Sequence, residues 1–386
     1  MNQLISNLSR NINYYDTITG NLLDASEALF PKRITANDLD ACLKNGLFTF
    51  RRTTESYSPV AGVLPIPGRT NWVLCEKQLN FHSSIFPRKL NPNTNLSRID
   101  QIAERYLKFI KDKTVAIELS GGLDTALIIE VLKRHGINLA FVGFSSDRYE
   151  FRTERAIQDH YLETSQNSKM IDYSYCPAFA KLSETPIHAF PTADSLYHAR
   201  HSMIADATKS VGANILLNGN AGDSLLCHGF EQVLDQVPQG YDGWCITDVW
   251  SVENIFKPQG ISYLCPFALD PVIRALIAIR KGQAEDSMKL WARKNFSELL
   301  PFQLSQYAYK ANHDGWVAEG LRDAENEIKV VVNNAQSVTK HPGLNFNKMI
   351  NTAMNYFHAT TKEKHEFLLK LSFAVWVHGF VRENFI

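Results

Sequence analysis

Apolar and polar positions change their spacing along the chain near residue 95. Residues 1–95 hold short alternating or aromatic runs broken by Pro-Ile-Pro and Asn-Pro-Asn, a pattern typical of short strands joined by turns. From residue 98 to residue 112 the apolar residues recur at helical spacing. We therefore expect a small β-rich N-terminal module over residues 1–95 and a larger domain over residues 98–386 with a helical C-terminal part.

The larger domain opens with apolar runs that end in glycine turns. Thr-Val-Ala-Ile-Glu-Leu at 114–119 is a short, mainly apolar run, and Ser-Gly-Gly-Leu-Asp-Thr at 120–125 leads into a helical pattern. A second apolar run at 139–144 completes a strand–helix–strand unit, which predicts a parallel sheet. A third run at 214–217 ends in a second glycine turn at 218–223. We expect an α/β fold with a doubly wound parallel sheet, and both turns at the edge where such sheets bind ligands.

The composition is that of a globular protein without a strong net charge. Of 386 residues, 45% are hydrophobic and 21% charged, and forty Lys plus Arg balance forty Asp plus Glu. Charge therefore gives no reason to expect a nucleic-acid or membrane partner. The six cysteines lack metal-ligand spacing, and no signal-peptide pattern or membrane-spanning run is evident. We expect a cytoplasmic protein.

The first glycine turn carries the strongest chemical signal. Gly121 and Gly122 let the backbone approach an oxyanion, while Ser120, Thr125 and the amides of the following helix can bind phosphate. The spacing is not that of a Walker loop, which disfavours γ-phosphate hydrolysis. Asp124 is suited to a magnesium ion that bridges phosphate oxygens. The alternatives are a purely structural turn and a helix-capping aspartate.

Several segments resemble one enzyme family in order and spacing. The first turn resembles the loop of the ATP pyrophosphatase superfamily, which cleaves ATP between the α- and β-phosphates. The second turn is similar to the Leu-Ser-Gly-Glu-Gly-Ser-Asp-Glu segment of asparagine synthetases, with Asp223 at that family's metal-binding aspartate. The resemblance to the synthetase domain covers residues 98–320 and extends to Cys265-Pro266-Phe267, Lys289, Arg293 and Lys310.

The resemblance implies the cofactors and the roles of these residues. ATP and Mg²⁺ are expected, with Asp124 and Asp223 as metal ligands. Lys310 is expected to neutralise the charge that develops on the adenylate during amine attack, with a solvated helix end as the alternative. Lys289 and Arg293 would either contact the triphosphate or solvate a helix face.

The sequence departs from the family at the acyl-acceptor end. Asn2 stands where glutamine-dependent members have a catalytic cysteine, so we expect residues 1–95 to be at most a degenerate glutaminase-like remnant. Asn220 replaces the glutamate of the second turn, and Ser262 and Leu264 replace a glutamate and an arginine. The resemblance therefore implies that the nucleotide-binding residues of the family are retained and that the substrate differs from that of asparagine synthetases.

A retained nucleotide-binding end combined with a changed acyl-acceptor end is similar to β-lactam synthetases and lasso-peptide macrolactam cyclases. The sequence leaves the choice between these two branches of the family open. We expect an AMP-forming amide ligase whose small-molecule or peptide substrate carries both a carboxylate and an amine. A precursor peptide or carrier protein is a conceivable partner. Tyr263, His228 and His313 are candidates for the proton acceptor, with a structural role as the alternative for each histidine.

Other functions stay open at this point. One alternative is ammonia-dependent amidation of the asparagine synthetase type. Another is an RNA thiolase or lysidine-type modifier, although neutral charge and the lack of paired catalytic cysteines disfavour the thiolase. A catalytically inactive protein that binds ATP as a scaffold is the non-enzymatic alternative.

Overall fold

The computed structural model describes six N-terminal strands and most of the chain after residue 110. The described ranges are 110–227 without 166, 188–192 and 221, then 252–268 without 253 and 254, residues 272 and 276, 288–306, 313–339 and 346–383. Most of the helical pattern expected from residue 98 to residue 112 lies outside these ranges. Within the described part, no helix combines the length and the apolar character needed to cross a bilayer.

A five-stranded parallel sheet forms the centre of the larger domain and confirms the predicted α/β fold class. The strands lie in the order β11-β10-β7-β8-β9, and every adjacent pair is parallel. The chain moves outward from β7 to β9 and then returns to the other side of β7, so the order reverses between β7 and β10. Their bounds are β7 Val115–Glu118, β8 Leu139–Ser145, β9 Ser168–Asp172, β10 Ile215–Leu217 and β11 Ser262–Leu264.

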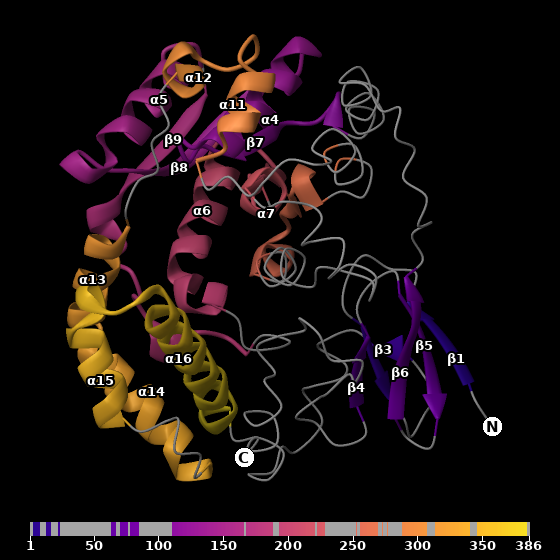
Figure 1. Cartoon of the computed structure of the whole chain (residues 1–386), viewed down its shortest axis with the longest axis vertical. Helices are drawn as coiled ribbons and strands as arrows, with labels where there is room; N and C mark the ends of the chain where they lie inside the picture. Colours follow the sequence, from indigo (N-terminus) through magenta and orange to yellow (C-terminus); the bar gives the residue numbers. More distant parts are fainter. Residues whose placement is uncertain are drawn as a thin grey trace.

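Helices cover both faces of this sheet, because buried residues on each strand alternate between two cores. Val115 and Ile117 of β7 pack with α4, α5, α11 and α12, whereas Ala116 between them packs with α6 (Figure 1). This two-sided burial explains why the central strands are almost entirely apolar. The helix bounds are α4 Leu123–Arg134, α5 Arg152–Leu162, α6 His198–Ser210, α7 Gly222–Cys227, α11 Leu290–Asn295 and α12 Phe302–Gln306.

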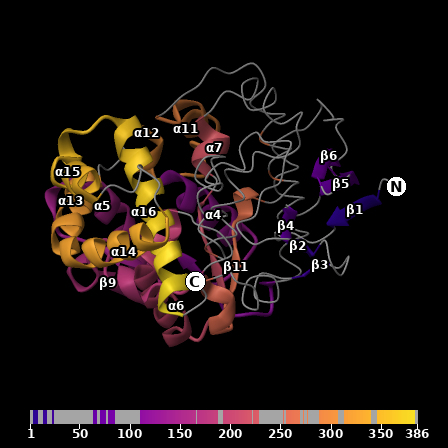
Figure 2. The same cartoon turned by 90° about the horizontal axis from the view of Figure 1, so that it is seen from below.

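The C-terminal helices build a separate hydrophobic core around α16. This helix begins with a capping box formed by Thr360 and Glu363, and its residues 371–378 are all buried, so the helix is a packing element of this core. It packs against α14 and α15, and Figures 1 and 2 show these helices side by side. The bounds are α13 Asp314–Asp323, α14 Glu325–Val338, α15 Phe346–Met354 and α16 Thr361–Arg382.

The N-terminal strands form two antiparallel sheets of three strands each, in the orders β1-β5-β6 and β3-β2-β4. Their derivation from a glutaminase-like domain stays a prediction, as does the module boundary at residue 95. The bounds are β1 Gln3–Asn7, β2 Asn13–Asp16, β3 Leu22–Leu23, β4 Val63–Ile66, β5 Thr70–Cys75 and β6 Gln78–Ser84.

Candidate functional site

The two glycine turns meet at the carboxyl edge of the sheet, where the strand order reverses. The first turn follows β7 and the second follows its neighbour β10. A Cβ added to Gly219 would lie 2.9 Å from Oγ1 of Thr125, and one added to Gly222 would lie 2.5 Å from the carboxyl carbon of Asp124. Only glycine permits this approach, so the second turn is built to lie against the first.

The first turn is rigid and leaves the amino end of α4 without a side-chain cap. Ser120 Oγ accepts a hydrogen bond from the Gly122 amide at 3.1 Å and shares one with Thr125 Oγ1 at 3.0 Å. Gly122 is the N-cap residue of α4 and has extended backbone angles, with no side-chain cap hydrogen bond. Because first-turn amides have no partner within a helix, this end suits an anion such as a phosphate group.

Gly121 fits its place for two independent reasons. Its φ is +78°, in the left-handed region that disfavours side chains, and an added Cβ would lie 2.8 Å from Cα of Glu154 on α5. The loop is therefore in direct contact with the first turn of α5. On the same helix Gln158 is buried, and its Nε2 donates to the carbonyl of Leu119 at 3.0 Å and to that of Phe144 at 2.8 Å.

Lys289 joins the two turns electrostatically. Its Nζ lies 2.6 Å from both carboxylate oxygens of Asp124 and 2.6 Å from Oδ1 of Asp223. Burial opposes the charge on the ammonium, but the two carboxylates outweigh it and raise the pKa of Lys289 above its usual value. The Lys289 backbone is left-handed, with φ 55°, which is uncommon for a residue other than glycine. Three predicted site residues thus meet at one point.

The two aspartates fit a magnesium ion that is shared with a ligand. In the part of the chain that the structure describes, no group of three or more His, Cys, Asp and Glu side chains could hold a metal on its own. Magnesium is usually bound by one or two carboxylates together with phosphate oxygens and water. Asp124 and Asp223 supply such a pair beside the anion-binding end of α4.

Of the two remaining predicted residues, the structure describes Arg293 but not Lys310. Arg293 is buried, and its guanidinium donates to the carbonyl of Met288 at 3.0 Å and to the carbonyl of Leu304. The second of these bonds joins α11 to α12. A triphosphate contact for Arg293 stays a prediction. Lys310 and His228 lie outside the described residues.

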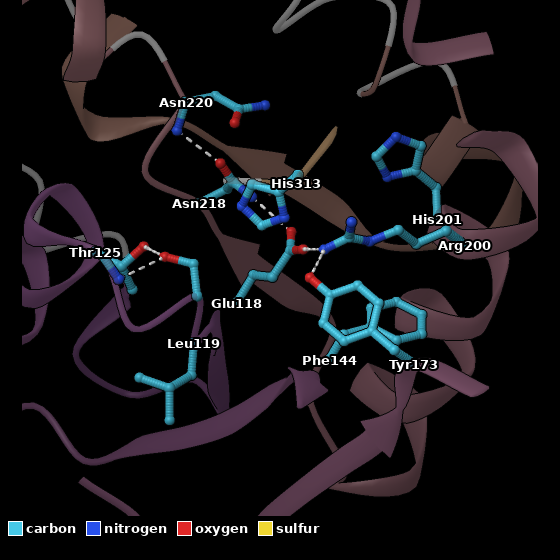
Figure 3. A network of polar contacts seen from close by, with 12 residues as sticks. Glu118, Leu119, Thr125, Phe144, Tyr173, Arg200, His201, Asn218, Asn220 and His313 are labelled. Atoms are coloured by element: carbon cyan, nitrogen blue, oxygen red, sulfur yellow. Dashed lines mark hydrogen bonds and ion pairs between the residues drawn. The ribbon is translucent and has the colours of Figure 1, made fainter. Parts of the chain in front are cut away.

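A chain of hydrogen bonds crosses the edge of three strands at the predicted acceptor end, and Figure 3 shows the part from Glu118 through Asn218 to Asn220. Glu118 Oε2 accepts a hydrogen bond from Asn218 Nδ2 at 2.5 Å, and Asn218 Oδ1 accepts one from the backbone N–H of Asn220 at 2.6 Å. Asn220 Nδ2 then donates to the Tyr263 hydroxyl at 3.0 Å. Burial raises the pKa of Tyr263 well above its usual value, so the phenol keeps its proton at neutral pH and is poorly suited to accept another.

Arg200 from α6 enters the same region among aromatic rings. Its Nη2 lies 3.4 Å from the Tyr173 hydroxyl and 3.9 Å from Glu118 Oε1, as Figure 3 shows. The guanidinium carbon lies 4.7 Å from the ring centre of Phe144 and 5.5 Å from that of Trp316. This cation is stabilised by ring faces and a loosely placed carboxylate.

Glu154 lies next to Arg200 and to His313. Its Oε1 is 3.8 Å from His313 Nε2, and its side chain is 21% exposed. Burial raises the pKa of Glu154 to about 7, although the charge of Arg200 acts in the opposite direction. The sequence analysis did not identify Glu118, Glu154 or Arg200. Only Glu118 left a signal, as a polar residue in the apolar run before the glycine loop.

Comparisons with known proteins add no argument about the function of this chain. No protein-family model matches the sequence, and no curated protein matches it. Among solved structures, the NMN synthetase from Francisella tularensis aligns with a TM-score of 0.32 and 10% sequence identity, over 72% of this chain and 92% of that one. A likeness of this size carries no functional argument, so the proposal for the function depends on the geometry of the two turns.

Proposed function

We propose that the chain is an ATP-dependent ligase that converts a substrate carboxylate into an acyl-adenylate, releases pyrophosphate and joins the acyl group to an amine. The observation that carries this proposal is the meeting of the two glycine turns, with Asp124 and Asp223 on one ammonium group at 2.6 Å. The motif resemblance to asparagine synthetases supports the same chemistry.

The residues of the first turn would bind the pyrophosphate end of ATP. The amides at the start of α4 have no side-chain cap and would donate to an anion, and the hydroxyls of Ser120 and Thr125 can donate to phosphate oxygens. Lys289 would supply positive charge beside them, and Lys310 is assigned by resemblance to the adenylate. A magnesium ion held by Asp124 and Asp223 would neutralise phosphate charge and orient the nucleotide.

The amine is proposed to belong to the substrate itself, so that the product is a lactam or macrolactam. In the second turn the family's glutamate is replaced by Asn220, whose side chain binds Tyr263. An ammonia-handling carboxylate is therefore missing at that position. Binding one molecule that carries both groups would bring amine and adenylate together and supply much of the rate by proximity.

The deciding experiment is exchange of labelled pyrophosphate into ATP, screened with amino acids and peptides in the presence of Mg²⁺. We expect exchange with one class of carboxylate and a loss of roughly 100-fold in Asp124→Asn, since the loop acts on developing phosphate charge. Asp206→Asn, on the exposed face of α6, is the matched control and is expected to keep wild-type exchange. Release of ADP and phosphate without exchange would contradict the mechanism.

The same assay separates the alternatives. Ammonium that serves as the acyl acceptor at millimolar concentration would identify intermolecular amidation. Exchange that requires added transfer RNA would identify an RNA modifier. Nucleotide binding without exchange for any carboxylate would identify a scaffold.

A further inference from the structure

The proposed ligase needs a group that receives the amine, and most carboxylates at the sheet edge are already engaged. Asp124 and Asp223 are held by Lys289 at 2.6 Å. Glu118 accepts from Asn218 at 2.5 Å and also faces Arg200. None of these three is available for a substrate amine without losing a strong partner.

Glu154 differs from them. Within the part of the chain that the structure describes, its carboxylate accepts no hydrogen bond and has one ion-pair partner, His313 at 3.8 Å. A partly buried carboxylate without a donor is costly, since it has given up water without gaining a replacement. The missing donor is the kind of group that a substrate amine would supply.

Its position also fits this role. The backbone of Glu154 touches Gly121, so the residue lies beside the loop that is proposed to bind the nucleotide. The groups that face its carboxylate come from other elements: Arg200 from α6, Tyr173 after β9 and His313 before α13. A raised pKa of about 7 leaves this carboxyl half-ionised near neutral pH, which suits a proton acceptor.

We propose that Glu154 binds the nucleophilic amine of the substrate and accepts its proton during attack on the acyl-adenylate. The assignment rests on the proposed function and gives Glu154 a part that the family assigns to the glutamate replaced here by Asn220. The ammonium form of the substrate first gives one proton to solvent. The nitrogen lone pair then forms the C–N bond, the bond between the acyl carbon and the phosphate oxygen breaks, and AMP leaves with that electron pair. The remaining extra proton on nitrogen passes to Glu154 and from there, by way of His313, to solvent.

The test compares the two half-reactions in Glu154→Gln, with the carboxylate identified by the exchange screen as substrate. We expect pyrophosphate exchange within about twofold of wild type and product formation slowed by roughly 100-fold or more, as for loss of a general base. Glu163→Gln, an exposed glutamate at the end of the same helix, is the matched control and is expected to keep both rates.

Two further readouts separate proton transfer from a structural role. Below about pH 7, product formation should rise more steeply with pH in wild type than in Glu154→Gln, because ionisation of Glu154 adds to the deprotonation of the substrate amine that both proteins share. Hydroxylamine, which needs little help to lose its proton, should trap the adenylate equally well in both proteins. If Glu154→Gln loses exchange and product formation equally, or forms product at the wild-type rate, the assignment of Glu154 is wrong while the proposed function stands. If no carboxylate supports exchange in wild type, the proposed function fails and the assignment fails with it.

Discussion

At the scale of single residues, Lys289 is the most informative side chain. Its ammonium neutralises two carboxylates that come from different helices, α4 and α7, and the side chain is only 11% exposed. A divalent cation between the same carboxylates would do the same electrostatic work. Asp124 and Asp223 therefore need a positive charge between them, and Lys289 supplies it when no metal is bound.

If a divalent cation can replace the Lys289 ammonium between the two carboxylates, Lys289→Met should respond to magnesium. Removing the ammonium leaves two carboxylates close together, which should lower the free energy of unfolding by about 1–3 kcal/mol in EDTA, given that Asp223 is half exposed. Magnesium should restore much of this loss by replacing the ammonium. Thermal unfolding in EDTA and in Mg²⁺ measures both effects. Lys329→Met, which removes an exposed ion pair on α14, should show neither, and a lack of magnesium rescue would argue against a metal site.

At the scale of elements, α13 shows how close packing depends on one glycine. Gly320 lies in this helix where a Cβ would be 2.5 Å from Cβ of Ala178, in the segment before η3 Leu182–Glu184. Gly315 lies at the other end of α13, where an added Cβ would meet only Glu150 Oε1 at 3.7 Å. The same substitution should therefore have opposite effects at the two positions.

We expect Gly320→Ala to destabilise the protein by about 3 kcal/mol, because the extra methyl group overpacks a buried contact. Gly315→Ala should instead stabilise it by about 0.5–1 kcal/mol, since alanine loses less backbone entropy in a helix. Urea unfolding of the two variants compares them directly. Equal effects would show that α13 does not pack against Ala178 as described.

At the scale of the whole molecule, His378 links separate parts of the C-terminal core. Its Nε2 lies 3.1 Å from the carbonyl of Ser183, and its Nδ1 lies 2.9 Å from Nδ2 of Asn334 on α14. The carbonyl can only accept, so Nε2 carries the proton and Nδ1 accepts from Asn334. The bonding pattern requires a neutral imidazole, and burial lowers the pKa of His378 below its usual value of 6.5.

A lowered histidine pKa makes the C-terminal core sensitive to acid. The stability that neutral His378 contributes is present above pH 6.5 and is lost as the pH falls through the lower pKa of the folded state. Hydrogen exchange of α14 and α16 amides should therefore become faster, relative to α4, at pH 5 than at pH 7.5. His378→Gln should remove this pH dependence, whereas the exposed His358→Gln should keep it.

The spacing of apolar residues and glycines predicted the sheet and the two turns, because these features depend on neighbouring residues in the sequence. The apolar runs and glycine turns led to the parallel sheet, and the strand ends brought Asp124 and Asp223 together as a doubly wound sheet requires. Lys289 was predicted with its partner undefined, because its contact spans distant segments. Arg200 and Glu154 lie in helices without a recognisable motif, and only the fold brings them to the sheet edge.

The two hydrogen bonds of Gln158 also fix the separation between Glu154 and the glycine loop. Because this one amide binds the carbonyl of Leu119, directly after β7, and the carbonyl of Phe144, near the end of β8, it holds α5 in place along the sheet. Glu154, one turn earlier on α5, is thereby kept at a constant separation from the glycine loop. Under the proposed chemistry, that separation selects substrates by the number of bonds between amine and carboxylate, and so sets the ring size of the product.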